Sequence, residues 1–94
     1  MSVAWTRRAL ADLDSARVYI AEESPSAAAR TIERIKTAIS AVARHPEIGR
    51  PGRVAGTREL VITGTPFILP YRVRAKRIEV LALIHGARRW PDEL

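Results

Sequence analysis

The sequence predicts an α+β fold in which an N-terminal antiparallel helical hairpin packs on one face of a small, mainly antiparallel sheet. Two apolar patterns of helical period occupy the first half of the chain, and only a few residues separate them. Short β-branched and aromatic runs then dominate the second half. Helices followed by strands favour a layer of helices on a sheet, and 94 residues are enough for one domain, expected to span 1–94.

The first elements expected are a short strand and a helix. The apolar run from Val3 to Trp5 is a candidate strand, with Trp5 as a packing residue. The pattern from Arg7 to Glu23 predicts the first helix, with Thr6 as its N-cap. Its apolar positions have spacings close to helical periodicity and are Leu10, Leu13, Val18 and Ile20, with alanines at 9, 11 and 16.

A second helix is expected from Pro25, because Ser24 is a suitable N-cap and proline is tolerated at the first helical position. Pro46 should end it, with Arg44 and His45 in the last turn. One apolar stripe at spacings of three and four is formed by Ala28, Ile32, Ile35, Ile39 and Val42. The short connection forces the two helices to lie antiparallel.

A loop and a three-stranded meander should complete the fold. Residues 46–56 hold three glycines, two prolines and the arginines at 50 and 53, which indicates a loop that is more often scaffold than site. Strands are expected in the runs 57–63, 67–73 and 77–84. Gly64-Thr65-Pro66 separates the first two, and a tight turn near Ala75-Lys76 separates the last two.

The middle strand has two distinct faces. Phe67, Leu69, Tyr71 and Val73 alternate onto the face expected to meet the helices, and Ile68, Pro70, Arg72 and Arg74 fall on the other face. Tyr71 should join the core with its hydroxyl reaching an edge partner. Pro70 cannot donate to a ladder, so a bulge or a local loss of pairing is expected there. The opposite, partly open face and its basic rim form the expected working surface.

Composition excludes several classes of site. The chain has no cysteine, so a disulfide framework, a thiolate zinc site and a thiol nucleophile are all excluded. The two histidines, His45 and His85, match no metal-ligand spacing, and we expect neither a metal nor a cofactor. The N-terminus lacks the apolar core of a secretory signal and no stretch is as long as a membrane span, which predicts a cytoplasmic protein.

Positive charge is concentrated in the second half of the chain. The net charge is +6 overall; residues 1–49 hold seven Lys/Arg and six Asp/Glu, whereas residues 50–94 hold nine and four. Such an imbalance favours an acidic partner, either nucleic acid or an acidic protein segment. The alternative is a solvated basic surface with no partner.

The chain also resembles the RelE/ParE superfamily, the small toxins of bacterial type II toxin–antitoxin modules. The resemblance covers nearly the whole chain and depends on an ordered set of short motifs, which are HPEIGRPG, GTREL, YRV and LIHGARRW. It implies a toxin that is neutralised by a cognate antitoxin through an acidic segment. It further implies one of two activities, because RelE-like members cut mRNA in the ribosome and ParE-like members poison DNA gyrase.

One position separates these activities. RNA-cleaving relatives commonly have an arginine three residues before the tyrosine that matches Tyr71, whereas this chain has Ile68. The ending LIHGARRWP also lacks the terminal tyrosine of some nucleases. The resemblance is therefore closer to the ParE branch, with gyrase as the expected target and a non-enzymatic mode of action. A ribosome-dependent mRNA endonuclease is the alternative, and a degenerate toxin that only binds its antitoxin is the third.

Each of these possible activities predicts its own set of site residues. Metal-free RNA cleavage needs a base, an acid and cations, for which the candidates are Glu59, Arg72, His85 and Arg88, with Arg58 and Arg89 as further cations. Candidates for contact with the target or the antitoxin are Arg50, Arg53, Arg58, Arg72, Arg74, Arg88, Arg89 and Trp90. Simpler roles are open: His85 could bond to backbone, Arg58 and Glu59 could pair on the surface, and Trp90 could fold back on the sheet.

Overall fold

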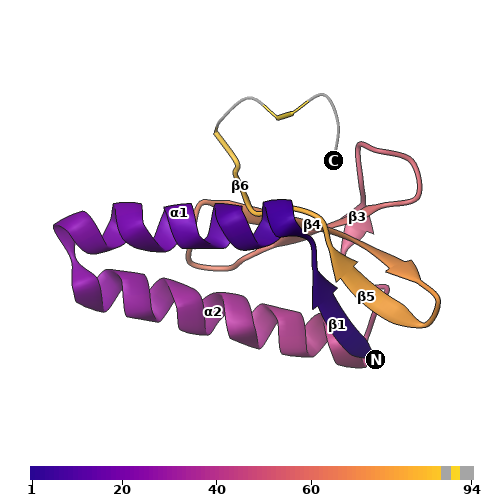
Figure 1. Ribbon diagram of the computed structural model, residues 1–94. Coiled ribbons are helices and arrows are strands. Elements are labelled where there is room, and N and C mark those ends of the chain that lie inside the picture. Colours follow the sequence, from indigo (N-terminus) through magenta and orange to yellow (C-terminus); the bar gives the residue numbers. More distant parts are fainter. Residues whose placement is uncertain (88–89, 92–94) are drawn as a thin grey trace.

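The computed structural model describes residues 1–87 and 90–91. Its elements in chain order are β1 (Ser2–Trp5), α1 (Arg7–Glu23), α2 (Pro25–Arg44), β2 (Arg50–Pro51), β3 (Arg58–Val61), β4 (Phe67–Arg74), β5 (Arg77–Val80) and β6 (Ile84–His85). Figure 1 shows the two helices side by side and antiparallel, with the sheet beyond them. The predicted α+β fold, a helical hairpin on a mainly antiparallel sheet, is confirmed.

Both helices begin where the sequence predicts, because a hydroxyl caps each N-terminus. The Ala9 N–H donates to Thr6 Oγ1 at 3.1 Å, and the Ala27 N–H donates to Ser24 Oγ at 3.2 Å. Each hydroxyl thereby satisfies one of the amide groups that a helix leaves unpaired at its start. Ser24 alone separates the two helices, so the chain reverses direction within one residue.

The buried face of α1 differs in part from the prediction. Leu10 is 52% exposed and Val18 is 43% exposed, so these two positions do not belong to the core. Three other predicted positions do pack against the core: Ala9 is fully buried, and Leu13 and Ala16 are partly buried. These residues follow each other at spacings of four and three, and the small alanines let α1 lie close to its neighbours. In α2 the predicted stripe is buried at Ala28, Ile35 and Val42.

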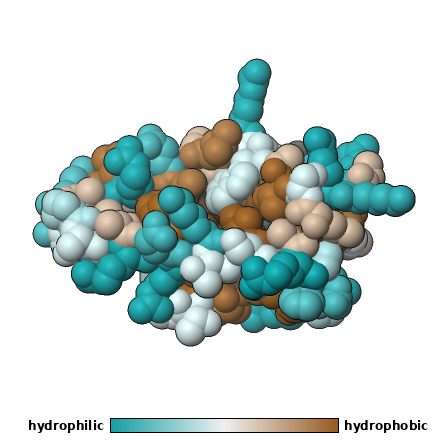
Figure 2. Space-filling view, turned by 90° about the horizontal axis from the view of Figure 1, so that it is seen from below, coloured by the Kyte–Doolittle hydropathy of each residue, from teal (hydrophilic) through white to brown (hydrophobic). Residues whose placement is uncertain are grey.

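The outer side of the helical layer is mixed in character. Figure 2 views the molecule from below, the side on which α2 and the N-terminus lie in Figure 1, and shows apolar groups among hydrophilic ones. Ile32 and Ile39 of α2 are only half-buried. The predicted stripe therefore buries its central residues and leaves its flanks partly accessible.

The sheet has the strand order β1-β5-β4-β3-β2, and β6 also pairs with β4. β1 runs parallel to β5, and the other pairs are antiparallel. Two details differ from the prediction. The run 77–84 forms two short strands, β5 and β6, instead of one, and the loop 46–56 contains the short edge strand β2.

Pro70 explains why the last run is divided. Tyr71 pairs with Val80, but Ile68 pairs with Ile84, so three residues, 81–83, lie opposite Leu69 and Pro70. The Leu81 N–H donates to the Pro70 carbonyl at 2.9 Å, which shows that the Pro70 backbone faces this side of the ladder. Its missing N–H therefore coincides with the extra residue, and the predicted bulge is confirmed.

Polar side chains of the first helix satisfy the backbone of the bulge. The Thr6 hydroxyl donates to the Leu81 carbonyl at 3.1 Å, and the Leu83 N–H donates to Asp12 Oδ2 at 3.0 Å. Because 81–83 are buried, these groups would otherwise lie away from water without partners, which is costly. Thr6 and Asp12 thus fix the bulge against α1.

The core lies between the helices and the face of β4 that carries Leu69 and Tyr71, both fully buried, as predicted. Val73 was expected on the same buried face but is 44% exposed, because β4 continues beyond the helices toward the β4–β5 turn. The Tyr71 hydroxyl accepts from the Gly49 N–H at 2.9 Å and donates to the Pro46 carbonyl at 2.6 Å. Burial raises the pKa of Tyr71, and this outweighs the Gly49 hydrogen bond and the nearby Arg58 charge.

Tyr71→Phe should therefore destabilise the fold by about 1–3 kcal/mol, since it leaves a buried N–H and a buried carbonyl unpaired. Urea unfolding monitored by circular dichroism measures this difference, with Tyr19→Phe at an exposed position as the control. The raised pKa adds a second signature. Above the ordinary pKa of 10.0 the unfolded state loses the Tyr71 proton first, so wild-type stability falls there and the Phe variant lacks this contribution. Equal stability of the two Phe variants would contradict the role assigned to the hydroxyl.

Candidate functional site: a cleft and an arginine-rich face

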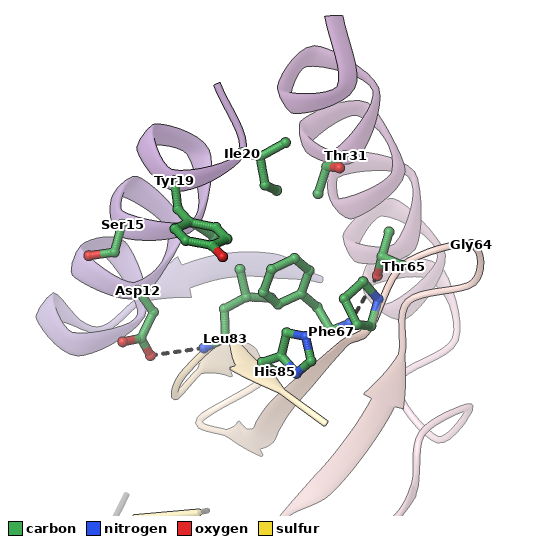
Figure 3. Close-up of a pocket in the computed structure, with 12 residues that line it drawn as sticks. Asp12, Ser15, Tyr19, Ile20, Thr31, Gly64, Thr65, Phe67, Leu83 and His85 are labelled. Atoms are coloured by element: carbon green, nitrogen blue, oxygen red, sulfur yellow. Dashed lines mark hydrogen bonds between the residues drawn. The ribbon is translucent and has the colours of Figure 1, made fainter. Parts of the chain in front are cut away.

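A cleft of about 530 Å³ lies between the helical hairpin and the end of β4. Figure 3 shows Phe67 and Leu83 at its base, Tyr19 and Ile20 from α1 above them, and Thr31 from α2 at the opposite side. Its base is apolar, whereas polar side chains such as Asp12, Thr31 and His85 also line it, so it suits a side chain or small ligand with both kinds of group. Tyr19 is 64% exposed, so the aromatic wall of this cleft is accessible from solvent.

His85 lies at this cleft, on the side of the sheet that faces the helices. It pairs with Phe67 across β4 and β6, and the two rings meet edge to face with centroids 5.8 Å apart. The Ala87 N–H donates to His85 Nδ1 at 3.2 Å. His85 therefore makes the local backbone bond that was its simpler predicted role, and its ring also lines the cleft.

Glu59 occupies the opposite face of the sheet and is only 4% exposed. Its carboxylate accepts from Arg50 Nε and Nη2 at 3.2 and 3.1 Å, and from the Arg53 N–H and Nε at 2.8 and 3.4 Å. Burial by itself would raise the pKa of Glu59, but the Arg53 N–H and the two guanidinium groups outweigh it and lower the pKa below 4.5. Glu59 is thus a charged anchor that holds two arginines.

Arg53 also contacts the C-terminal segment. Its Cζ lies 3.5 Å from the centroid of the Trp90 ring, in cation–π geometry. Because Arg53 bonds to Glu59, this contact places Trp90 over the face of the sheet opposite the helices. Trp90 is half-buried there, and its Nε1 is buried without a hydrogen-bond partner in the part of the chain that the structure describes. Trp90 thus packs against the loop between β2 and β3 through Arg53.

The other predicted arginines are distributed over different surroundings. Arg58 lies on the helix side and donates through Nη1 to the Glu47 and Gly49 carbonyls at 3.1 and 2.8 Å. The expectation that Arg58 and Glu59 are surface charges paired across the meander is wrong, because Arg58 bonds to backbone carbonyls and Glu59 is buried. Arg72 bonds to Glu79 at 2.7 Å across β4 and β5. Arg74 is exposed at the end of β4.

The candidate residues are therefore only partly brought together. Arg50, Arg53, Glu59 and Trp90 form one continuous cluster, termed the arginine clasp below. The nuclease candidates are divided, since Glu59 and Arg72 lie on one face of the sheet in separate ion pairs and His85 lies on the other. Arg88 and Arg89 lie outside the described residues.

Two residues of the cleft had no functional role in the sequence prediction. Asp12 holds the backbone of Leu83 while its side chain lines the cleft, and Tyr19 supplies the aromatic wall. No local signal identifies Asp12, because its partner is 71 positions away. Tyr19 could have been noticed as an aromatic residue outside the apolar stripe of its helix. Within the described ranges, no group of three or more metal-ligating side chains converges, and neither helix is long and apolar enough to cross a membrane.

These features define a small cationic α+β protein with a cleft on one side and an arginine-rich face on the other. Residues 3–90 match the family described as ParE toxin of type II toxin–antitoxin system, parDE. The chain belongs to this ParE toxin family, and it is a toxin of a type II toxin–antitoxin system. The predicted membership of the RelE/ParE superfamily, on the ParE side, is confirmed.

Individual relatives agree over nearly the full chain. The chain is 46% identical to Y4kP of Sinorhizobium fredii, described as a candidate toxin, over 98% of this chain and 95% of the relative. It is 43% identical to toxin RelE2 of Caulobacter vibrioides, over 92% and 96% of the two chains. A structure of the chromosomal ParDE toxin–antitoxin system from P. aeruginosa matches with a TM-score of 0.72 at 33% identity. The match covers 90% of this chain and 95% of that chain. The E. coli RelBE toxin–antitoxin complex shows the same fold, with a TM-score of 0.65 at 15% identity. The match covers 94% of this chain and 98% of that chain.

The arginine clasp gives a prediction for stability and its dependence on pH. Glu59→Gln should destabilise the fold by about 2 kcal/mol at pH 7, because it removes the charge that both guanidinium groups bond. The lowered pKa of Glu59 means that this contribution is present above pH 4.5 and is lost as the pH falls through the lower value of the folded state. Chemical unfolding at several pH values measures the difference, which should shrink in acid. Glu47→Gln at an exposed position is the control; a gap that persists unchanged in acid would show that charge is not the cause.

Proposed function

We propose that this toxin inhibits DNA gyrase in the bacterial cytoplasm and is neutralised by a cognate antitoxin through an acidic segment. Its membership of the ParE family and its similarity to the P. aeruginosa ParDE system support this proposal. Its net charge of +6 supports an acidic partner. The toxin acts by contact and needs no metal or cofactor.

The main support for a binding mechanism is the separation of the nuclease candidates. A general base must have a free lone pair near the proton that it removes. Both oxygens of Glu59 already accept bonds from arginines, and Arg72 is paired with Glu79. His85 lies on the opposite side of the sheet from both. Among the described residues, Glu59, Arg72 and His85 would therefore not meet one phosphodiester together.

The two sides of the molecule suit two partners. The part of the cleft beside Tyr19 and Phe67 would receive an apolar side chain of the antitoxin, because aromatic walls in a concave site favour such anchors. The face that carries Arg50 and Arg53 would contact the gyrase complex, with Trp90 already ordered beside it. Because the two surfaces are separate, the antitoxin would bind the toxin without occupying the surface that contacts the gyrase complex.

Purified toxin should block supercoiling by gyrase or stabilise cleaved DNA in its presence. Arg53→Ala should weaken inhibition about tenfold or more, because it removes a cation and releases Trp90 from its contact. A supercoiling assay on relaxed plasmid measures the effect, and Arg30→Ala on the exposed face of α2 is the matched control.

The same preparation separates the alternatives. Normal supercoiling at saturating toxin would refute the gyrase proposal. Cleavage of mRNA on translating ribosomes, abolished by His85→Ala, would establish the endonuclease alternative instead. Folded protein that binds its antitoxin but has neither activity and causes no growth arrest would be a degenerate toxin.

The cleft gives a prediction for the antitoxin. Tyr19→Ala should weaken antitoxin binding by about tenfold or more, which corresponds to about 1.4 kcal/mol. Leu10→Ala removes an exposed apolar side chain from the same helix but not from the cleft, so it is the control. Isothermal titration calorimetry with the antitoxin measures both; equal losses, or none, would place the antitoxin elsewhere.

A further inference from the structure

The turn between β4 and β5 concentrates positive charge at one end of the molecule. Arg74, Lys76 and Arg77 are all exposed, and Ala75 lies between them. Figure 1 shows this turn at the end of the sheet remote from the connection between the two helices. Residues 74–77 are termed the cationic tip below.

The cationic tip is unfavourable for the stability of the isolated protein. Arg74 and Arg77 are direct cross-strand partners, and like charges in this position repel. Ala75 and Lys76 have φ angles of 52° and 58°, in the left-handed region that glycine or asparagine adopts at lower cost. Among the described residues the three cations of the tip form no salt bridge.

The neighbouring pair shows that compensation is possible on the same strands. Two residues from the tip, Arg72 is bonded to its cross-strand partner Glu79. A carboxylate in place of Arg77 would compensate Arg74 in the same way. The uncompensated charge at the tip is therefore best explained by an anionic partner outside the chain.

Phosphate is the anion that suits this geometry. Arginine binds phosphate in a bidentate manner, and three exposed cations lie within four residues at the tip. Ala75 is the one apolar residue of the tip, and the neighbouring Val73 is 44% exposed. A protein segment would need a buried apolar anchor for stable binding, whereas contact with a DNA backbone is mainly electrostatic.

We propose that the cationic tip binds the phosphate backbone of duplex DNA, independently of base sequence. The inference deepens the proposed function, because the DNA that gyrase holds would then contribute to toxin binding. The tip and the arginine clasp would contact different parts of one gyrase–DNA complex.

Fluorescence anisotropy of a labelled DNA duplex with the purified full chain tests this directly and does not involve gyrase. The tip variant is Arg74→Ala/Lys76→Ala/Arg77→Ala. The control, Arg7→Ala/Arg30→Ala/Arg44→Ala, removes the same charge from exposed helix positions. At low salt the tip variant should bind DNA roughly tenfold or more weakly than the control, and its plot of log K against log salt should be less steep by about 2–3.

The outcomes separate this inference from the proposed function. Equal DNA binding by the two variants overturns the inference, as does a tip variant that loses affinity for the antitoxin but not for DNA. Tighter binding of RNA than of duplex DNA of the same length also overturns it. Wild-type toxin that inhibits gyrase without tip-dependent DNA binding refutes this inference alone, whereas tip-dependent DNA binding without gyrase inhibition refutes only the proposed function.

Discussion

The hydroxyl of Tyr71 is the contact on which the arrangement of this protein depends. It joins the middle strand to the segment that follows α2, through Gly49 and Pro46, at a fully buried position. A side chain at Gly49 would overlap the Tyr71 ring, with an added Cβ only 2.6 Å from the hydroxyl oxygen. These bonds hold the segment 46–49 against the sheet. The backbone position from which Arg50 and Arg53 extend is thereby fixed.

The arginine clasp shows how a buried charge can organise a surface. A carboxylate as buried as Glu59 is costly unless it is fully paired, and the loop supplies both guanidinium groups and one backbone N–H. The loop is consequently held in one conformation, and Arg53 is oriented so that its other side meets Trp90. The carboxylate therefore positions the aromatic residue without contacting it directly, and the proposed target surface is formed before any partner arrives.

The features that the sequence predicted correctly are those set by residues close together in the chain. The limits of α2 follow from Ser24, Pro25 and Pro46, which act within a few residues, and the bulge follows from the missing N–H of Pro70. Contacts over longer separations were not predictable in this way. Nothing near Glu59 indicates its burial, because that depends on the path of a loop. The apolar face of α1 was predicted only in part, because apolar residues also occupy its exposed positions Leu10 and Val18.

The parallel pairing of β1 with β5 has a consequence for the order of folding during synthesis. Val3 leaves the ribosome 75 residues before its partner Ile78. The helical hairpin can form from local contacts while β1 is still without a neighbour, whereas the sheet must close a long loop before β1 gains its hydrogen bonds. A nascent toxin would thus expose an unpaired strand and an uncovered helical face for much of its translation.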